Sequence, residues 1–86
     1  MEEETIRNDD IICIGTNIRD IRIRRHMGQT QLVRLLQLQG VSITREALVK
    51  IERGVQHIKV SQLRAIRECL EVSYEELIQE TASLPR

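Results

Sequence analysis

The 86-residue sequence contains one aromatic side chain, Tyr74, and one proline, Pro85. With no Phe or Trp, a hydrophobic core has to be built from Ile, Leu and Val, and such a core suits packed helices. The length fits one domain and leaves no room for a second. Because no alternating strand pattern, internal repeat or low-complexity tract is present, we expect an all-α fold, a compact five-helix bundle.

The sequence also lacks a long apolar run and a metal-binding spacing. Its longest uncharged apolar stretch, Ile11–Ile14, is far too short for a signal peptide or a membrane span. Cys13 and Cys69 have no Cys or His neighbour at a ligand spacing, so we expect reduced thiols, with neither a disulfide nor a metal site. We therefore expect a cytoplasmic protein with no cofactor and no membrane partner.

The net charge is zero, but the charges are segregated along the chain. Residues 1–17 carry one Arg against five acids, residues 18–59 carry nine Lys or Arg against three acids, and residues 60–86 carry three Arg against five acids. The central region alone therefore has a net charge of +6. That is enough to contact phosphates, because binding depends on the cations that face the nucleic acid and not on the whole-chain sum.

Apolar residues at a spacing of three or four predict five short helices. The first begins after Asp10, a plausible N-cap, and ends near His26. The second begins at Gln29 and is closed by Gly40 as a C-terminal cap. The inward positions of the first are Ile11, Ile14, Ile18 and Ile21, and those of the second are Leu32, Val33 and Leu36.

The remaining three helices have clear start or stop signals. Thr44 can cap the third helix, and Gly54 ends it. The fourth covers about residues 61–71. Ser73 forms a capping box with Glu76, three residues later, and so begins the fifth helix. The inward positions of these helices are Ala47, Leu48, Ile51, Leu63, Ile66, Leu70 and Leu77.

The segment 44–54, read Thr-Arg-Glu-Ala-Leu-Val-Lys-Ile-Glu-Arg-Gly, resembles the phage Cro and repressor type of helix-turn-helix protein, often called the Xre family. Gln29, Arg19 and Arg22 fit the same pattern. The resemblance covers roughly residues 14–78, with further matches at Ile14, Gly15, Leu70, Val72, Ser73, Glu76 and Leu77.

This resemblance implies a lambda-repressor-like DNA-binding domain over residues 11–80, between an acidic N-terminal arm (1–10) and a C-terminal tail (81–86). Helices two and three would form the helix-turn-helix. Helix three would enter the major groove of double-stranded DNA, while helix two would lie across the backbone.

With its apolar face inward, the third helix presents four other side chains: Arg45, Glu46, Val49 and Lys50. Arg45 can donate two hydrogen bonds to guanine, and Lys50 can do so less directionally. Glu46 can accept from a cytosine amino group, and Val49 can touch a thymine methyl group. Thr44 belongs to the same predicted surface. The alternative is an ordinary solvated helix face, but an exposed Val49 among charges argues against it.

Gln29 matches the position at which the family places a glutamine against a phosphate, and the backbone amides at that helix start add to an anion site. Without this context, a glutamine near a helix start is more often a plain surface residue. Arg53 and Lys59 follow the third helix, where phosphate contacts are expected to position the domain. The resemblance also implies a buried or half-buried ion pair between Glu52 and Arg22.

The sequence departs from the family between helices two and three. Gln29 to Thr44 spans fifteen residues, whereas the family uses about ten. We place the extra residues in an added turn of helix two, Gln37–Gln39, followed by Gly40 and a connector, Val41–Ile43, whose apolar side chains can pack on the core. We expect this insertion to affect base contacts more than the fold.

A single helix-turn-helix covers only a few base pairs, so we expect a homodimer that reads operator DNA as a transcriptional regulator, most simply a repressor. Apolar surface for the dimer is supplied by Tyr74, Leu77, Ile78 and Leu84. Alternatively, Tyr74 and Ile78 close the core of the monomer.

The main alternative function is a protein-interaction module of the antitoxin or antirepressor type that keeps the same fold. Arg45, Lys50 and Arg53 favour DNA, because a protein binder need not keep that face basic. A regulatory protein can still be a second partner. No enzyme is expected, since His26 and His57 have no paired acid, nucleophile or glycine-rich phosphate loop near them in sequence.

Overall fold

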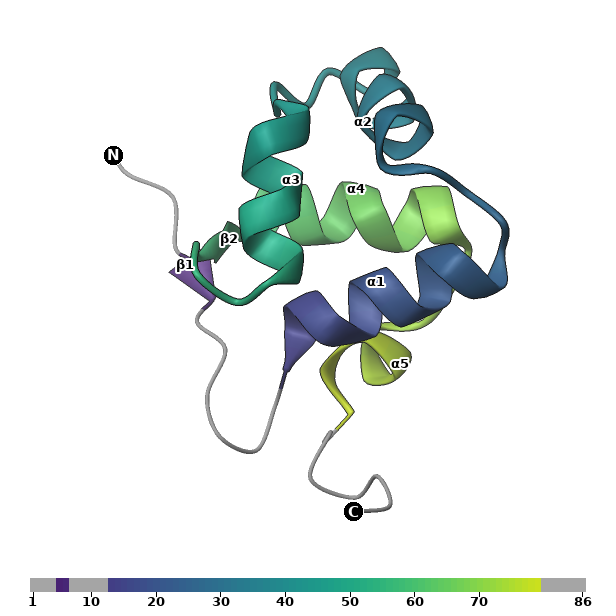
Figure 1. Ribbon diagram of the computed structural model, residues 1–86, viewed down its shortest axis with the longest axis vertical. Coiled ribbons are helices and arrows are strands. Elements are labelled where there is room, and N and C mark those ends of the chain that lie inside the picture. The colour runs from purple at the N-terminus through teal and green to yellow at the C-terminus, as the bar shows by residue number, and fades with distance from the viewer. Residues whose placement is uncertain (1–4, 7–12, 80–86) are drawn as a thin grey trace.

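Helices dominate the computed structural model, which describes residues 5–6 and 13–79. Within that part of the chain, five helices and two short strands follow one another (Figure 1): β1 (Thr5–Ile6), α1 (Ile14–Arg24), α2 (Gln29–Leu38), α3 (Arg45–Glu52), β2 (Ile58–Lys59), α4 (Val60–Leu70) and α5 (Tyr74–Ile78). The predicted five-helix fold is confirmed.

The helices share one core of aliphatic side chains. α1 packs against α3, α4 and α5, whereas α2 packs against α3 and α4. In Figure 1, α5 therefore lies on the other side of α1 from α2. The largest fully buried side chains are all Ile or Leu: Ile14, Ile18, Leu32, Leu36, Leu48, Ile51, Ile66, Leu70 and Leu77. The core is filled without an aromatic ring, as the composition predicted.

α1 begins later than the sequence predicted. Its first residue is Ile14, and the N-cap is Cys13, whose side chain makes no capping hydrogen bond. The predicted start after Asp10 is therefore wrong, and Asp10 itself lies outside the described residues. The first turn is instead set by packing, because Gly15 is buried directly against the backbone of α3.

The long connection between α2 and α3 is partly helix and partly an ordered turn. α2 continues to Leu38, and Gly40 then adopts a φ of 85°, a left-handed conformation that favours glycine. The Gln37 side chain donates to the Ile43 carbonyl at 3.1 Å, and Ile43 is buried in the core. The predicted extra turn of helix two and the packed connector are thus confirmed.

Two of the predicted helix starts are capped by side-chain hydrogen bonds. The Ala47 backbone N–H donates to Thr44 Oγ1 at 3.0 Å, which fixes the start of α3. At α5, the Glu76 N–H donates to Ser73 Oγ at 3.1 Å, and the Ser73 N–H donates to Glu76 Oε1 at 3.0 Å.

A small antiparallel sheet joins the amino-terminal segment to the chain that follows α3. Thr5 pairs with Lys59, and Ile6 pairs with Ile58. The all-α class still holds, and this pairing is a local addition to it: each strand is only two residues long, too short to show alternation in sequence. The rest of the predicted acidic arm and the predicted tail lie outside the described residues.

Candidate DNA-binding surface

The position of α3 depends on a close crossing with α1. Gly15 lies so near to α3 that a Cβ atom there would overlap the carbonyl oxygen of Ile51. On the same side, Leu48 and Ile51 are fully buried. α3 is therefore held along one face by direct backbone contact and aliphatic packing, which leaves its opposite face outward.

The outward face of α3 carries the side chains that the sequence predicted for base contacts. Arg45, Glu46 and Lys50 are exposed, and Val49 is half-buried, so it is less exposed than expected. None of the three charged side chains forms an ion pair or a side-chain hydrogen bond with another described residue. Their polar groups are thus free to meet a ligand.

A buried ion pair ties the end of α3 to α1. Arg22 Nε donates to Glu52 Oε2 at 2.8 Å, and Arg22 Nη2 donates to Glu52 Oε1 at 3.0 Å. The side chains of Arg22 and Glu52 are 9% and 1% exposed. Arg22 Nη1 also donates to the Met27 carbonyl at 2.8 Å, which holds the turn between α1 and α2. The ion pair implied by the family resemblance is present, and this third bond is an addition to it.

Gln29 joins the same network from the start of α2. Its Nε2 donates to Glu52 Oε1 at 3.1 Å. The N-cap of α2 is Gly28, which supplies no side-chain cap, so the first backbone N–H groups of this helix lack intrahelical acceptors. The start of α2 thus combines a half-buried glutamine, anchored to α3, with unpaired amide donors.

Further exposed cations follow α3. Arg53 is the C-cap of α3, and Lys59 lies in β2 directly before α4. Both side chains are exposed, as is that of His57 between them. The Lys59 backbone N–H donates to Gln62 Oε1 at 2.9 Å, which fixes the backbone of this residue while its side chain stays outward.

The apolar residues predicted for a dimer are divided between core and surface. Leu77 is fully buried, so its assignment to an exposed dimer surface is wrong; it packs in the monomer core. Tyr74 and Ile78 remain 44% and 40% exposed. The Arg67 guanidinium lies 4.8 Å from the centre of the Tyr74 ring. Leu84 is outside the described residues.

Sequence reasoning missed one polar residue that braces the fold. Asn17 is buried, and its Nδ2 donates to the Leu77 carbonyl at 2.8 Å and to the Gln79 carbonyl at 2.9 Å. It thus ties α1 to the end of α5. The available signal was a polar residue between two inward positions of a helix, Ile14 and Ile18.

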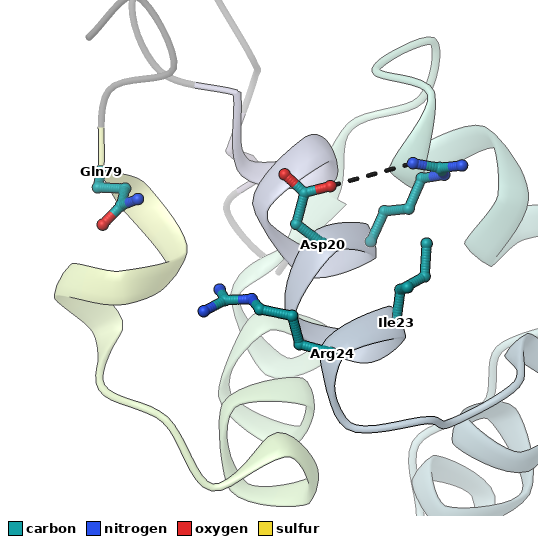
Figure 2. A pocket seen from close by; sticks show the side chains of 5 residues that line it. Asp20, Ile23, Arg24 and Gln79 are labelled. Carbon is teal, nitrogen blue, oxygen red and sulfur yellow. Dashed lines mark ion pairs between the residues drawn. The ribbon is translucent and has the colours of Figure 1, made fainter. Parts of the chain in front are cut away.

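An open hollow of about 540 Å³ lies on the outer side of α1. Figure 2 shows Asp20, Ile23 and Arg24 on α1, with Arg24 pointing toward the side on which Gln79 lies at the end of α5. Arg19, which also lines the hollow, lies 4.0 Å from Asp20 Oδ1. The charges here are exposed and of both signs, so this hollow offers no concentrated charge to a phosphate.

No protein-family model and no curated protein matches the chain. Its structure is similar to the crystal structure of the restriction-modification controller protein C.AhdI from Aeromonas hydrophila, with a TM-score of 0.65 and 21% sequence identity. The match covers 77% of this chain and 92% of that one.

The chain has the helix-turn-helix fold. The predicted five-helix arrangement is therefore confirmed, with α2 and α3 as the two helices of the helix-turn-helix. No helix within residues 13–79 is long and apolar enough to cross a membrane.

Proposed function

We propose that this protein is a sequence-specific DNA-binding transcriptional regulator, a cytoplasmic repressor that reads operator DNA as a homodimer. The observation that carries the proposal is the outward face of α3. Arg45, Glu46 and Lys50 are exposed and unpaired among the described residues, while the inner face of the same helix is fixed in place. A rigid helix that presents unpaired donors and acceptors is what base readout in the major groove requires.

In this proposal, α3 reads bases. Arg45 donates two hydrogen bonds to guanine O6 and N7, and Lys50 contacts a second acceptor. Val49 touches a thymine methyl group through the part of its side chain that stays exposed. Thr44, whose hydroxyl oxygen accepts from the Ala47 N–H, keeps its own hydroxyl hydrogen free to donate.

The residues around α3 hold the DNA backbone. The amides at the start of α2 and the remaining N–H of Gln29 bind one phosphate. Arg53 and Lys59 bind phosphates on the other side of α3. Because Gln29 is bonded to Glu52, and Glu52 to Arg22, the phosphate contact and the recognition helix are held in one rigid unit.

A dimer explains the exposed apolar residues of α5. Tyr74 and Ile78 are one helical turn apart on α5. This helix lies on the opposite side of α1 from α2 (Figure 1). Burying them between two copies would leave α3 of each copy free for one half-site of a symmetric operator. The fold shared with a protein described as a restriction-modification controller supports a regulatory role.

A protein partner is the second candidate, favoured by two other exposed apolar side chains. Leu38 is 79% exposed at the end of α2, and Val55 is 65% exposed in the loop after α3. An antitoxin or antirepressor type of module would use such residues to bind protein and not DNA. Because single exposed apolar residues are common on protein surfaces, this candidate ranks below DNA binding.

The proposal is tested by measuring DNA affinity against salt concentration for a charge-matched pair of variants. Arg45→Gln/Lys50→Gln removes two positive charges from α3. Arg19→Gln/Arg24→Gln removes two from the hollow on α1. We expect the first variant to lose at least about tenfold in affinity and to show a shallower salt dependence, while the second binds nearly as the parent does. Equal losses in both variants would contradict the placement of DNA on α3.

A further inference from the structure

Asn17 lies in the first turn of α1, between the two helices on which the proposed function depends (Figure 1). Gly15, two residues earlier, lies against the backbone of α3 at Ile51. Because successive helix residues are about 100° apart, residues two apart point to nearly opposite sides of the helix. The Asn17 side chain accordingly reaches α5, where its Nδ2 donates to the carbonyls of Leu77 and Gln79. The first turn of α1 therefore contacts α3 on one side and α5 on the other.

α5 is too short for packing alone to fix its direction. It has five residues, and Leu77 is the buried one among them. A single buried side chain fixes where a helix lies but leaves its tilt about that point free. The start of α5 is also held, by the Ser73–Glu76 capping box and by the contact between Tyr74 and Arg67. The tilt is therefore decided by what holds the other end.

The other end of α5 is held by Asn17. The two carbonyls that accept from its amide, at 2.8 and 2.9 Å, belong to Leu77 and Gln79, on either side of Ile78, the last residue of the helix. Asn17 is 6% exposed, so water has little access to compete for these bonds. Both amide hydrogens are thus used to fix the end of α5 on α1.

The direction of α5 matters because the proposed dimer forms through this helix. In a symmetric dimer, the tilt of α5 on α1 sets the direction of the two-fold axis relative to α3. Half-sites one helical turn apart place each α3 roughly 17 Å from that axis, since the turn is about 34 Å long. A tilt of about 10° then displaces each α3 by about 3 Å, close to the rise of about 3.4 Å between base pairs. A small change at α5 therefore matters on the scale of one base pair.

We propose that Asn17 is a positioning residue that sets the separation of the two α3 helices in the dimer, and with it the half-site spacing that the protein accepts. This inference rests on the proposed function. It gives Asn17 no contact with DNA and no part in the base preference within a half-site. Without the two hydrogen bonds, α3 still reads each half-site, but α5 can tilt and operators of altered spacing are tolerated.

A purely structural role for Asn17 makes a different prediction. If its hydrogen bonds only stabilise the monomer, their loss lowers the melting temperature and the fraction of protein that is able to bind. The apparent affinity for every operator then falls by the same factor. The ratio of the affinities for two spacings stays the same, so this ratio separates the two roles.

The experiment compares the full chain with Asn17→Ala and with Ala65→Gly, a control that weakens the fold within α4. A two-fold symmetric operator is first selected from a random DNA pool with the parent chain. Affinity is then measured for this operator and for versions in which one base pair is added or removed between the half-sites. We expect the parent to prefer its own spacing at least about tenfold, because only that spacing lets both α3 helices bind at once. Asn17→Ala should lower this ratio at least about fivefold, whereas Ala65→Gly should keep it.

A second variant keeps the test valid if Asn17→Ala does not fold. Asn17→Ser retains one hydrogen-bond donor on a shorter side chain that no longer spans the two carbonyls, so it should also lower the ratio. The melting temperature of each variant shows whether it is folded at the temperature of the binding measurements.

An unchanged ratio in a folded Asn17 variant would overturn the inference and leave the proposed function intact. An equal decrease in Ala65→Gly would overturn it as well, because the effect would then follow from lower stability. A parent chain that selects a symmetric site but binds all spacings equally would have the same consequence. If the parent selects no symmetric site, the proposed reading as a dimer fails and this inference fails with it.

Discussion

Arg22 and Glu52 form a two-pronged ion pair that joins α1 to the end of α3, with Nε–Oε2 and Nη2–Oε1 distances of 2.8 and 3.0 Å. Gln29 adds a third hydrogen bond to the same carboxylate from α2. α1, α2 and α3 therefore meet at one buried carboxylate. The outward presentation of the α3 face depends on this contact as well as on the aliphatic core.

Removing one partner of this ion pair should be more harmful than removing both. We expect Arg22→Met or Glu52→Leu alone to lower the free energy of unfolding by roughly 3–5 kcal/mol, because each leaves a charge that is buried and uncompensated. The double variant should lose less than the sum of the two. Urea unfolding of all four proteins measures the coupling. Additive losses, within about 0.5 kcal/mol, would show that the two groups do not act together.

Gly15 should be irreplaceable at the crossing of α1 and α3. Because a Cβ there would overlap the Ile51 carbonyl, we expect Gly15→Ala to lower the free energy of unfolding by roughly 1–3 kcal/mol. Gly28→Ala is the matched control, since a Cβ at Gly28 meets nothing within 4 Å and its φ is −79°. That variant should change stability by less than about 1 kcal/mol. Similar losses in the two variants would contradict the close crossing.

A charge at Ile78 should disrupt the proposed dimer, whereas a charge at Leu38 should not affect it. We expect Ile78→Asp to shift the protein from dimer to monomer and to weaken DNA binding with it, because a charge would be buried between the copies. Leu38→Asp introduces the same charge at a more exposed apolar residue and should leave the dimer intact. Sedimentation equilibrium separates these cases. A parent chain that stays monomeric on DNA would refute the proposed surface.

Cys69 should be a slowly reacting thiol. Burial, and to a lesser extent the charge of Glu68, raises the pKa of the Cys69 thiol above its ordinary value of 9.0. Less thiolate is then present at neutral pH, so alkylation of a Cys13→Ser variant should be slow and should still accelerate above pH 9.0. Glu68→Gln lowers the pKa and should increase the rate at pH 8 about twofold. A rate that levels off below pH 9.0 would contradict this environment.

Local signals in the sequence predicted much of the fold. Thr44 and the Ser73–Glu76 pair are caps whose hydrogen bonds form within three residues, so their chemistry is readable without the tertiary structure. Gly40 marks the end of a helix for the same reason. The partnership of Arg22 and Glu52 was predictable only through the family resemblance, because nothing local links two residues so far apart.

Features that depend on contacts between distant segments were not predicted. Asp10 is a better capping residue than Cys13, yet α1 begins after Cys13, in the turn where Gly15 packs against α3. The bracing role of Asn17 depends on hydrogen bonds to the end of α5, about sixty residues away in sequence. The pairing of Thr5 with Lys59 joins segments more than fifty residues apart in sequence. No local pattern in the sequence identifies the partners of these long-range contacts.

The most direct test of the account is selection from a random-sequence DNA pool at two salt concentrations. The parent chain is compared with Arg45→Ala/Lys50→Ala, and the retained DNA is sequenced. We predict enrichment of a two-fold symmetric site by the parent, weaker retention at the higher salt concentration, and loss or relaxation of the selected sequence in the variant. No enriched sequence and no binding even at low salt would contradict the central claim that the outward face of α3 reads DNA.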